Sequence, residues 1–365
     1  MARGPTQCRG LLRPPDTLGD LRSMSAAFPK IVFGGPDRPP RLLRDLLEEK
    51  VDAVPAGGTI HWLTYYFRDL ALADALVRAQ RRGVTVRLAL EGEPHVENAN
   101  EPAIARLGGV NGIGDGLRVV RHRLPGHLHT KLYCFSHPQP VALVGSFNPS
   151  GNEPEDPAIV ADIGDQDRGH NLLVELGQPA LVKAFVARAA AIHSGSGRFG
   201  LVSMSLNATV RSQGYTGYFF PRLGPNPLER FLARLRRGSK LRIAASHIRD
   251  ETLARRLSGL VKRGVDVQVL THHTMRRAPD AMVNYLRNQG ITVYRYEHPD
   301  ELPMHSKFIL AEDQDRAWST FGSYNLKGRS RWLNQELLVH SDDRGLWNTF
   351  DERWRDIVAE PWCRS

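Results

Sequence analysis

The chain has 365 residues, 41% of them hydrophobic, which is enough to bury a large core. Its net charge of +10 favours an anionic partner, although basic pairs such as Arg276-Arg277 are interpreted as solvated helix ends. No apolar run is long enough to span a bilayer and no apolar signal segment precedes residue 28, so we expect a cytoplasmic protein without a transmembrane segment. The three widely spaced cysteines exclude a disulfide framework and a Cys-x-x-Cys zinc site.

The expected elements alternate between helix and strand. After residues 1–27, which we expect to form a flexible extension, a helical pattern covers residues 41–49. A second helix ends at Gly83, and a β-rich segment follows over residues 84–90. Strand, helix and strand in succession make βαβ units, which indicates an α/β fold. The later segments are helices over residues 179–192, 227–235 and 253–261, and a strand over residues 265–270.

The two halves of the chain repeat one another. Arg68 and Gly83 in the first half correspond to Arg249 and Gly264 in the second, at separations of 249 − 68 = 181 and 264 − 83 = 181. Apolar residues match around both landmarks. A repeat of this length indicates two similar lobes rather than a solenoid.

One polar motif occurs in each half. Its members are His129, Lys131, Gly145, Ser146 and Asn148 in the first half, and His305, Lys307, Gly322, Ser323 and Asn325 in the second. The separations are 305 − 129 = 176 for the histidines and 322 − 145 = 177 for the glycines. Either part of the motif alone would most often be an ordinary strand or turn. Its recurrence in the same order at matched separations indicates a functional site.

These residue types suit a phosphoryl group. On a strand, His and Lys two residues apart project from one face, so an imidazole and an ammonium point into the same space. The glycine lets the backbone approach a ligand, while the serine hydroxyl and the asparagine amide offer hydrogen bonds. Oxygens that gather charge in a transition state are stabilised by such donors. No cluster of His, Asp, Glu and Cys has metal-ligand spacing, so we predict neither a metal nor a cofactor.

At these residues the chain resembles the phospholipase D superfamily, in which His-x-Lys, Asp and Gly-Ser-x-Asn occur twice in pseudodimeric members. The resemblance covers residues 28–365 and implies two lobes, residues 28–205 and 206–365. Each is expected to be a mixed, mostly parallel sheet flanked by helices, and a pseudo-twofold axis is expected to relate the two. The superfamily signature has an Asp where this chain has Ser136 and Glu312.

The resemblance also implies a mechanism. One histidine attacks the phosphodiester to form a phosphohistidine, the other protonates the leaving oxygen, and water or an alcohol then releases the phosphoryl group. By analogy, His129 is the expected nucleophile. A downstream Glu orients the histidine in the family; Glu336 fits this role in the second half, and Glu175 is the candidate in the first. An alternative alignment of Asn171 with Asn334 leaves Glu336 without an acidic counterpart.

An acidic stretch interrupts only the first half, between Asn148 and His170. This stretch is either a solvated surface loop, as loops usually are, or a lid that recognises a cationic group of the substrate such as choline. Among nearby aromatic residues, Tyr215 and Tyr218 are candidates for substrate contact. The acidic residues are Glu153, Glu155, Asp156, Asp162, Asp165 and Asp167.

Three functions are compatible with these patterns. A phosphodiesterase or phosphatidyltransferase acting on phospholipid-like substrates is favoured by the acidic stretch and the aromatic residues. A nuclease is favoured by the basic charge and the lack of membrane signals, whereas a non-catalytic phosphate-binding protein is opposed by the retention of both motifs. We favour the first, with an anionic phosphodiester (phospholipid or nucleic acid) as partner, a peripheral membrane contact and a monomer of two lobes.

Overall fold

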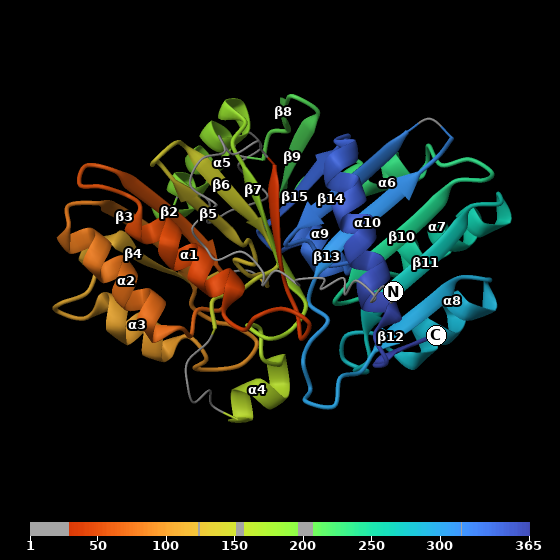
Figure 1. The fold of residues 1–365 in the computed structure, drawn as a ribbon, viewed down its shortest axis with the longest axis horizontal. Helices are drawn as coiled ribbons and strands as arrows, with labels where there is room; N and C mark the ends of the chain where they lie inside the picture. Colours follow the sequence, from red (N-terminus) through yellow and green to blue (C-terminus); the bar gives the residue numbers. More distant parts are fainter. Residues whose placement is uncertain (1–28, 123–124, 151–156, 196–206, 315) are drawn as a thin grey trace, which may run out of the picture.

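The computed structural model describes residues 29–122, 125–150, 157–195, 207–314 and 316–365. Their helices and strands form two α/β lobes that lie side by side (Figure 1). One sheet has the strand order β1-β7-β6-β5-β2-β3-β4, and the other β16-β12-β11-β10-β13-β14-β15-β9-β8. Residues 1–27 and the acidic residues Glu153, Glu155 and Asp156 lie outside the described residues.

The first lobe contains seven strands and five helices among its described residues. The strands are β1 (Lys30–Gly34), β2 (Thr59–Thr64), β3 (Thr85–Glu91), β4 (Leu117–Val120), β5 (Leu132–Phe135), β6 (Val141–Gly145) and β7 (Asn171–Leu176). The helices are α1 (Leu42–Asp52), α2 (Leu70–Arg81), α3 (Glu101–Gly108), α4 (Pro157–Ile163) and α5 (Pro179–His193), with a 3-10 turn at Gly114–Gly116.

The second lobe contains nine strands and five helices among its described residues. The strands are β8 (Val210–Ser212), β9 (Tyr215–Phe220), β10 (Lys240–Ala245), β11 (Asp266–His272), β12 (Thr292–Tyr296), β13 (Lys307–Glu312), β14 (Ala317–Gly322), β15 (Glu336–Ser341) and β16 (Cys363–Arg364). The helices are α6 (Pro227–Leu232), α7 (Glu251–Lys262), α8 (Asp280–Asn288), α9 (Gly328–Trp332) and α10 (Arg344–Ala359).

The duplication read from the sequence is visible in the strand order. The run β7-β6-β5-β2-β3-β4 has the same connectivity as β15-β14-β13-β10-β11-β12. Both sheets are mixed, as predicted, but antiparallel pairings outnumber parallel ones. Among the strands of the described residues, only β2-β3, β3-β4, β10-β11 and β11-β12 are parallel. The expectation of mostly parallel sheets is wrong because β5 and β6, like β13 and β14, are joined by short hairpins, which require antiparallel pairing.

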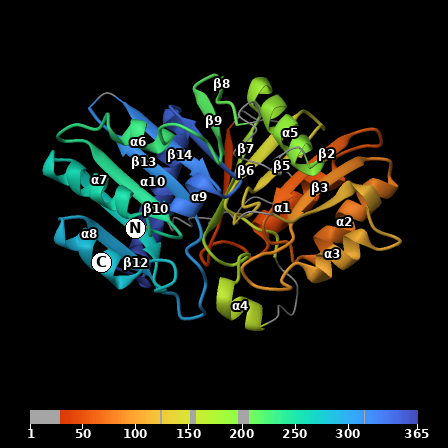
Figure 2. The same cartoon turned by 180° about the vertical axis from the view of Figure 1, so that it is seen from behind.

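The helices and sheets bury three large apolar cores. Helices α1, α2 and α3 pack on the outer face of the first sheet, and α6, α7 and α8 on the outer face of the second (Figures 1 and 2). The third core contains residues of both lobes, with Leu172 and Phe185 from the first beside Phe321 and Phe350 from the second. The two lobes therefore share one apolar interior, which holds their sheets in a fixed relation.

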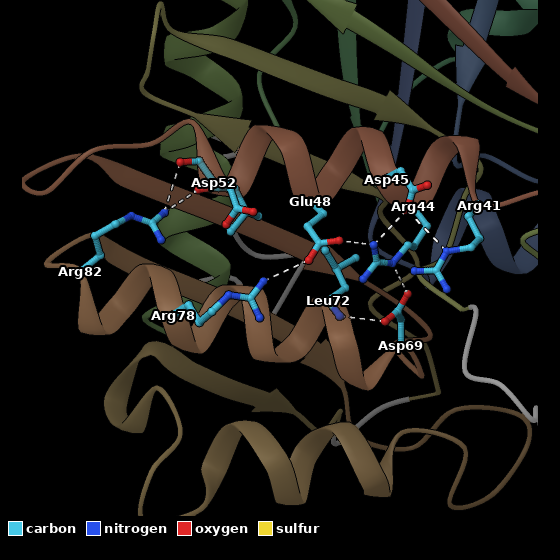
Figure 3. Close-up of polar contacts among 10 residues, drawn as sticks. Arg41, Arg44, Asp45, Glu48, Asp52, Asp69, Leu72, Arg78 and Arg82 are labelled. Atoms are coloured by element: carbon cyan, nitrogen blue, oxygen red, sulfur yellow. Dashed lines mark hydrogen bonds and ion pairs between the residues drawn. The ribbon is translucent and has the colours of Figure 1, made fainter. Parts of the chain in front are cut away.

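A buried ion pair fixes the entry to α2 (Figure 3). Arg44 of α1 donates from Nε to Oδ2 of Asp69 at 2.9 Å and also pairs with Glu48. Asp69 caps α2, because its Oδ1 accepts a hydrogen bond from the Leu72 amide at 2.7 Å. This network anchors the segment between β2 and α2, which carries Tyr65 into the cavity described below.

The predicted helices and strands correspond to observed ones, with small shifts at their ends. The main local difference concerns the His-x-Lys segments, which were expected to lie within strands. Strand β5 begins at Leu132 and β13 begins at Lys307, so that both motif histidines lie just before a strand. In the described part of the chain, no helix is both long and apolar enough to cross a bilayer.

Candidate active site

The two motifs meet where the lobes touch. The amide of His129 donates to the carbonyl of Gln335 at 2.9 Å, and the amide of His305 donates to the carbonyl of His170 at 2.9 Å. A parallel β-bridge adjoins each of these bonds. Each motif histidine is therefore attached to the backbone of the opposite lobe, immediately before strand β15 or β7.

Each histidine ring is also oriented by a side chain of the opposite lobe. Nδ1 of His129 lies 2.9 Å from Oε2 of Glu336, and Nδ1 of His305 lies 2.8 Å from Oδ1 of Asn171. Carboxylate and amide oxygens accept hydrogen bonds, so both Nδ1 atoms carry the proton. Nε2 of each ring is then the nitrogen with a free lone pair. Glu336 lies where the sequence predicted, but its partner is the histidine of the other lobe.

Glu175 does not reach either histidine, which corrects the prediction for the first lobe. Its carboxylate pairs with Lys50 at 2.5 Å. The counterpart of Glu336 is Asn171, and both residues begin a strand that continues Leu-Leu-Val. This shared tripeptide is the sequence signal that identifies Asn171. The acidic stretch conceals it, because Asn171 follows Gly145 by 171 − 145 = 26 residues, whereas Glu336 follows its glycine by 336 − 322 = 14.

The motif serines hold these orienting side chains. Oγ of Ser146 donates to Asn171 at 3.0 Å, and Oγ of Ser323 donates to Glu336 at 2.6 Å. Each hydroxyl also accepts from the amide of the residue after its partner. Both serines are fully buried, so they position the histidine partners rather than contact the substrate as predicted.

The motif glycines make room for a neighbouring strand rather than for a ligand. A Cβ at Gly145 would lie 2.0 Å from the carbonyl oxygen of Leu172, and one at Gly322 would lie 2.2 Å from that of Leu337. Gly322 also has a φ of 141°, which other residues rarely adopt. The predicted role of both glycines in substrate binding is therefore replaced by a structural one.

The motif lysines are buried beside the histidines. Nζ of Lys131 donates to the carbonyl of His129 at 2.8 Å, and Nζ of Lys307 donates to that of His305 at 2.7 Å. Burial lowers the pKa of Lys131 to about 7, although Glu336 opposes the shift. Burial and the nearby Lys131 charge hold the pKa of Lys307 well below its ordinary value. An anion placed between these groups would restore both charges.

The two motif asparagines have different surroundings. Asn148 lines the cavity and accepts a hydrogen bond at its Oδ1 from the Tyr66 amide at 3.3 Å. Within the described residues, neither the Oδ1 nor the Nδ2 of the buried Asn325 has a partner. Buried amides are normally hydrogen-bonded, so the unpaired Nδ2 of Asn325 is suited to donate to an acceptor oxygen of a ligand.

A cavity of about 460 Å³ opens over both motifs. A smaller cavity of about 250 Å³ beside Arg118 contains no motif residue. The aromatic rings of the large cavity are Tyr65 and Tyr66, and the ring centroid of Tyr65 lies 5.2 Å from Nζ of Lys131. The lining residues are Tyr65, Tyr66, His95, His127, His129, Asn148, Ile163, Gln166, His247, Arg249, Arg276, Arg277, His305, Lys327, Arg329 and Asn334.

Tyr215 and Tyr218 are absent from this lining, contrary to the prediction. Both belong to strand β9. The hydroxyl of Tyr215 donates to Asp343 at 3.0 Å, and the ring of Tyr218 packs against Phe231. They are part of the structural framework of the second lobe.

Burial and neighbouring charges shift the pKa values of the ionisable groups of the site. Burial lowers the pKa of His129 to about 3; the Glu336 carboxylate opposes this shift and Lys131 adds to it. Burial likewise lowers the pKa of His305 well below its ordinary value, and the Lys307 and Arg277 charges add to the effect. Burial alone would raise the pKa of Glu336, but His129 and Lys131 hold it below its ordinary value. The arrangement is thus an ionised Glu336 beneath a neutral His129.

The described part of the acidic stretch lines one side of the cavity through Ile163 and Gln166. It also contacts the second lobe, because Arg276 pairs with Asp162 at 3.3 Å. Asp167 accepts a hydrogen bond from the Arg41 amide at 2.8 Å, and burial raises its pKa to about 7. No carboxylate is among the lining residues drawn from the described segments, so this part presents no recognition site for a cationic group.

One group of possible metal ligands lies outside the cavity. Asp37, His170 and Glu360 have ligand atoms close together. Arg353 already occupies this group, because its Nη2 lies 2.8 Å from Oδ1 of Asp37 and 3.0 Å from Nδ1 of His170. The cluster is an ion-pair network at the boundary of the lobes, and its chemistry does not suit a divalent cation.

The two residues at the signature Asp position have local roles. Oγ of Ser136 accepts from the Thr59 amide at 2.8 Å, and Glu312 pairs with Arg344 at 2.8 Å. Both contacts lie within their own lobe. The departure from the signature therefore leaves the His, Lys and Asn sets in place.

Comparisons with known proteins agree with this geometry. A family model described as "Cardiolipin synthase, PLD-like domain" matches residues 55–153 and 232–357. Cardiolipin synthase A of Yersinia pseudotuberculosis serotype O:1b (strain IP 31758) is 32% identical over 103 residues, which are 27% of this chain and 20% of that protein. The same values hold for cardiolipin synthase A of Yersinia pestis. The match thus spans about a fifth of the length of these relatives.

Solved structures with the same architecture have lower sequence identity. Phosphatidylserine synthase of Haemophilus influenzae Rd KW20 has a TM-score of 0.65 at 13% identity, over 92% of this chain and 87% of that one. Polyphosphate kinase of Porphyromonas gingivalis has a TM-score of 0.59 at 13% identity, over 91% of this chain and 51% of that one. These likenesses concern the fold. Because the matched family segments cover more than half of the sequence and include both motifs, the chain belongs to the cardiolipin synthase PLD-like domain family of the phospholipase D superfamily.

Proposed function

We propose that the chain is a phosphodiesterase or phosphatidyltransferase that acts on a phospholipid-like phosphodiester through a covalent phosphohistidine. This proposal rests on the crossed pairing of the motif histidines, in which the ring of each histidine is hydrogen-bonded to a side chain of the opposite lobe. Each has its Nδ1 held by the opposite lobe, and a buried lysine donates to the backbone carbonyl of each histidine. A nucleophile, an acid and fixed donors for phosphoryl oxygens are the parts that phosphodiester transfer requires.

The difference between Glu336 and Asn171 supports His129 as the nucleophile. A phosphoryl group on Nε2 leaves an imidazole ring that carries positive charge, with its proton on Nδ1. The Glu336 carboxylate at 2.9 Å stabilises that charge. Asn171 orients His305 without a charge, so that His305 is the stronger acid once protonated. The anionic substrate offsets the nearby lysine and arginine charges, and we expect its binding to raise the pKa of His305.

The steps follow from this assignment. Nε2 of His129 attacks phosphorus as the bond to the leaving oxygen breaks, and His305 transfers its proton to that oxygen. Water or an alcohol then attacks phosphorus, and His305 accepts its proton as the nitrogen–phosphorus bond of His129 breaks. Hydrolysis and transfer differ only in the acceptor. The buried lysines and the Asn148 and Asn325 amides stabilise the phosphoryl oxygens throughout.

The family supports phospholipid as the substrate class, because its description names cardiolipin synthase and the Yersinia relatives carry that name. Nuclease activity is the second candidate. It is favoured by the cations that line the cavity, since nucleic acid is bound mainly through its phosphates. Incubation of the purified protein with phosphatidylglycerol in mixed micelles and with single-stranded DNA separates the two. Release of nucleotides with no turnover of lipid would refute the phospholipid proposal.

The roles of the histidines can be tested with two leaving groups. p-Nitrophenolate departs without a proton, whereas an alkoxide requires one. His129→Ala should abolish cleavage of both kinds of phosphodiester, and His305→Ala should lose far more activity on the alkyl ester than on the p-nitrophenyl ester. Mass spectrometry of the trapped enzyme should find the phosphoryl group on His129. A phosphoryl group on His305, with the opposite leaving-group pattern, would reverse the assignment.

A further inference from the structure

The two lobes contribute different charges to the cavity. Besides the motif residues, the first lobe lines it with aromatic, imidazole, apolar and amide side chains. All the lysines and arginines that line the cavity in the described segments come from the second lobe. We call this set the cationic shelf; it consists of Arg249, Arg276, Arg277, Lys327 and Arg329.

Most of the cationic shelf is not a consequence of the duplication. Strand β3 and strand β11 correspond over their whole length, at 266 − 85 = 181 and 272 − 91 = 181. At the same separation, Arg276 and Arg277 correspond to His95 and Val96 (276 − 181 = 95). Lys327 corresponds to Ser150 at the motif separation (327 − 177 = 150). The motif site therefore recurs in both lobes, whereas these three cations occur in only one.

Arg277 is a buried cation with an unused donor. Only 4% of its surface is exposed, and its Nη2 donates to the carbonyl of Ile163 at 2.9 Å. Its buried Nη1 meets no acceptor in the described parts of the chain. For Lys327, no carboxylate of the described residues lies within ion-pair distance. A buried guanidinium without a counter-charge is costly, which indicates an anionic ligand beside it.

The positive charges of the lysines and arginines at the cavity exceed the negative charge of one reacting phosphodiester. A phosphodiester carries one negative charge and already lies against Lys131 and Lys307 in the proposed mechanism. Asp162 pairs with Arg276, and Glu336 lies beneath His129. Arg277 and Lys327 remain without a carboxylate partner among the described residues. We propose that the cationic shelf is a subsite for a second phosphate, carried by the substrate or by the alcohol acceptor; this proposal rests on the proposed function.

Two sources of the second phosphate share this chemistry. An acceptor phospholipid brings its own headgroup phosphate, and a nucleic acid brings the next phosphate of its chain. In the lipid assay, transfer from phosphatidylglycerol to a second phosphatidylglycerol is compared with transfer to ethanol. In the nucleotide assay, thymidine 5′-(p-nitrophenyl phosphate) with a 3′-phosphate is compared with the same ester without one. In each assay, the ratio of kcat/KM for the substrate with a second phosphate to kcat/KM for the substrate without one measures how much that phosphate contributes to the reaction.

The test uses the full chain with Arg277→Gln and Lys327→Gln, alone and together. Loss of one charge-assisted hydrogen bond should lower the ratio in one assay about tenfold. Arg263→Gln is the matched control, because this arginine is exposed in the same lobe and lies outside the cavity. A fall in the lipid ratio assigns the shelf to the acceptor, and a fall in the nucleotide ratio assigns it to nucleic acid. Unchanged ratios in both assays would refute the subsite.

A binding measurement tests the second-phosphate subsite independently of catalytic activity. Calorimetry with inorganic phosphate and with inorganic tripolyphosphate requires no turnover. The unmodified protein should bind tripolyphosphate more tightly than phosphate, and the double variant should lose about tenfold or more of that preference. If the preference is retained by the double variant, the shelf proposal fails even if the enzyme is active. If the preference is lost but no phosphodiester is cleaved, the subsite stands and the proposed function fails.

Discussion

Replacing Glu336 by Gln removes the charge beneath His129 while keeping the shape of the side chain. In the structure, this carboxylate is fully enclosed and accepts from Nδ1 of His129 at 2.9 Å, with Ser323 and Ser330 as further donors. A hydrogen bond to a charged group contributes about 1.5–3 kcal/mol, against about 0.5–1.5 kcal/mol for a neutral one. The difference of about 1–1.5 kcal/mol predicts that phosphorylation of His129 slows about tenfold in Glu336→Gln.

The assay is the burst of p-nitrophenolate from bis(p-nitrophenyl) phosphate, which reports phosphorylation of the enzyme without a demand for an acid. Glu175→Gln is the matched control, because it makes the same change in a carboxylate that pairs with Lys50 instead of a motif histidine. Thermal melting of both variants identifies any loss that comes from unfolding. The control should react at the rate of the unmodified protein.

Two results would refute this reasoning. A burst rate in Glu336→Gln equal to that of the unmodified protein would show that the carboxylate does not stabilise phosphorylated His129. A comparable loss in Glu175→Gln would show that Glu175, despite its distance from the motif histidines, is the orienting residue after all.

Three further predictions concern the whole protein. Burial lowers the pKa of His129 to about 3 and that of His61 to about 4, against 6.5 when unfolded. The unfolded chain therefore binds more protons at acid pH, so the stability that these groups contribute should be complete above the unfolded pKa of 6.5 and fall progressively as the pH is lowered toward about 4 and 3, as melting temperatures would show. Activity should survive EDTA; loss in EDTA with recovery on adding a divalent ion would contradict the prediction that the site needs no metal. Residues 207–365 expressed alone lack Asn171 and half of the shared core, so this fragment should show no turnover until the first lobe is added.

The sequence predicted the parts of the site that depend on short patterns. His129, His305 and Asn148 line one cavity, each motif lysine donates to the carbonyl of its histidine, and the α/β lobes and their duplication are observed. Glu336 was also placed at a histidine, because its spacing from Gly322 is undisturbed. Asn171 was missed because the acidic stretch changes that spacing in the first half.

Other features depend on contacts that no local pattern encodes. The crossed pairing of histidines follows from the way two lobes meet, and a repeat alone does not specify which residue of one half faces which of the other. Arg276-Arg277 looked like a solvated helix end, yet Arg277 is buried at the cavity, where it donates to the carbonyl of Ile163 at the end of α4. The sequence pattern predicted that the motif serines and glycines contact the ligand. In the structure their neighbours are strands β7 and β15, and the spacing in the sequence does not predict these strand pairings.

The two motif histidines have different partners, because a carboxylate is present only at His129. With identical partners at both histidines, a phosphodiester would react equally well in either orientation. Glu336 on one side and Asn171 on the other make the two faces inequivalent. Under the proposed mechanism, the leaving alcohol departs, and the entering alcohol arrives, beside His305. That face belongs to the lobe that carries the cationic shelf. Under the proposed mechanism, the exchanged alcohols would therefore enter and leave on the side of the second lobe, and the retained part of the substrate would lie on the side of Tyr65 and Tyr66.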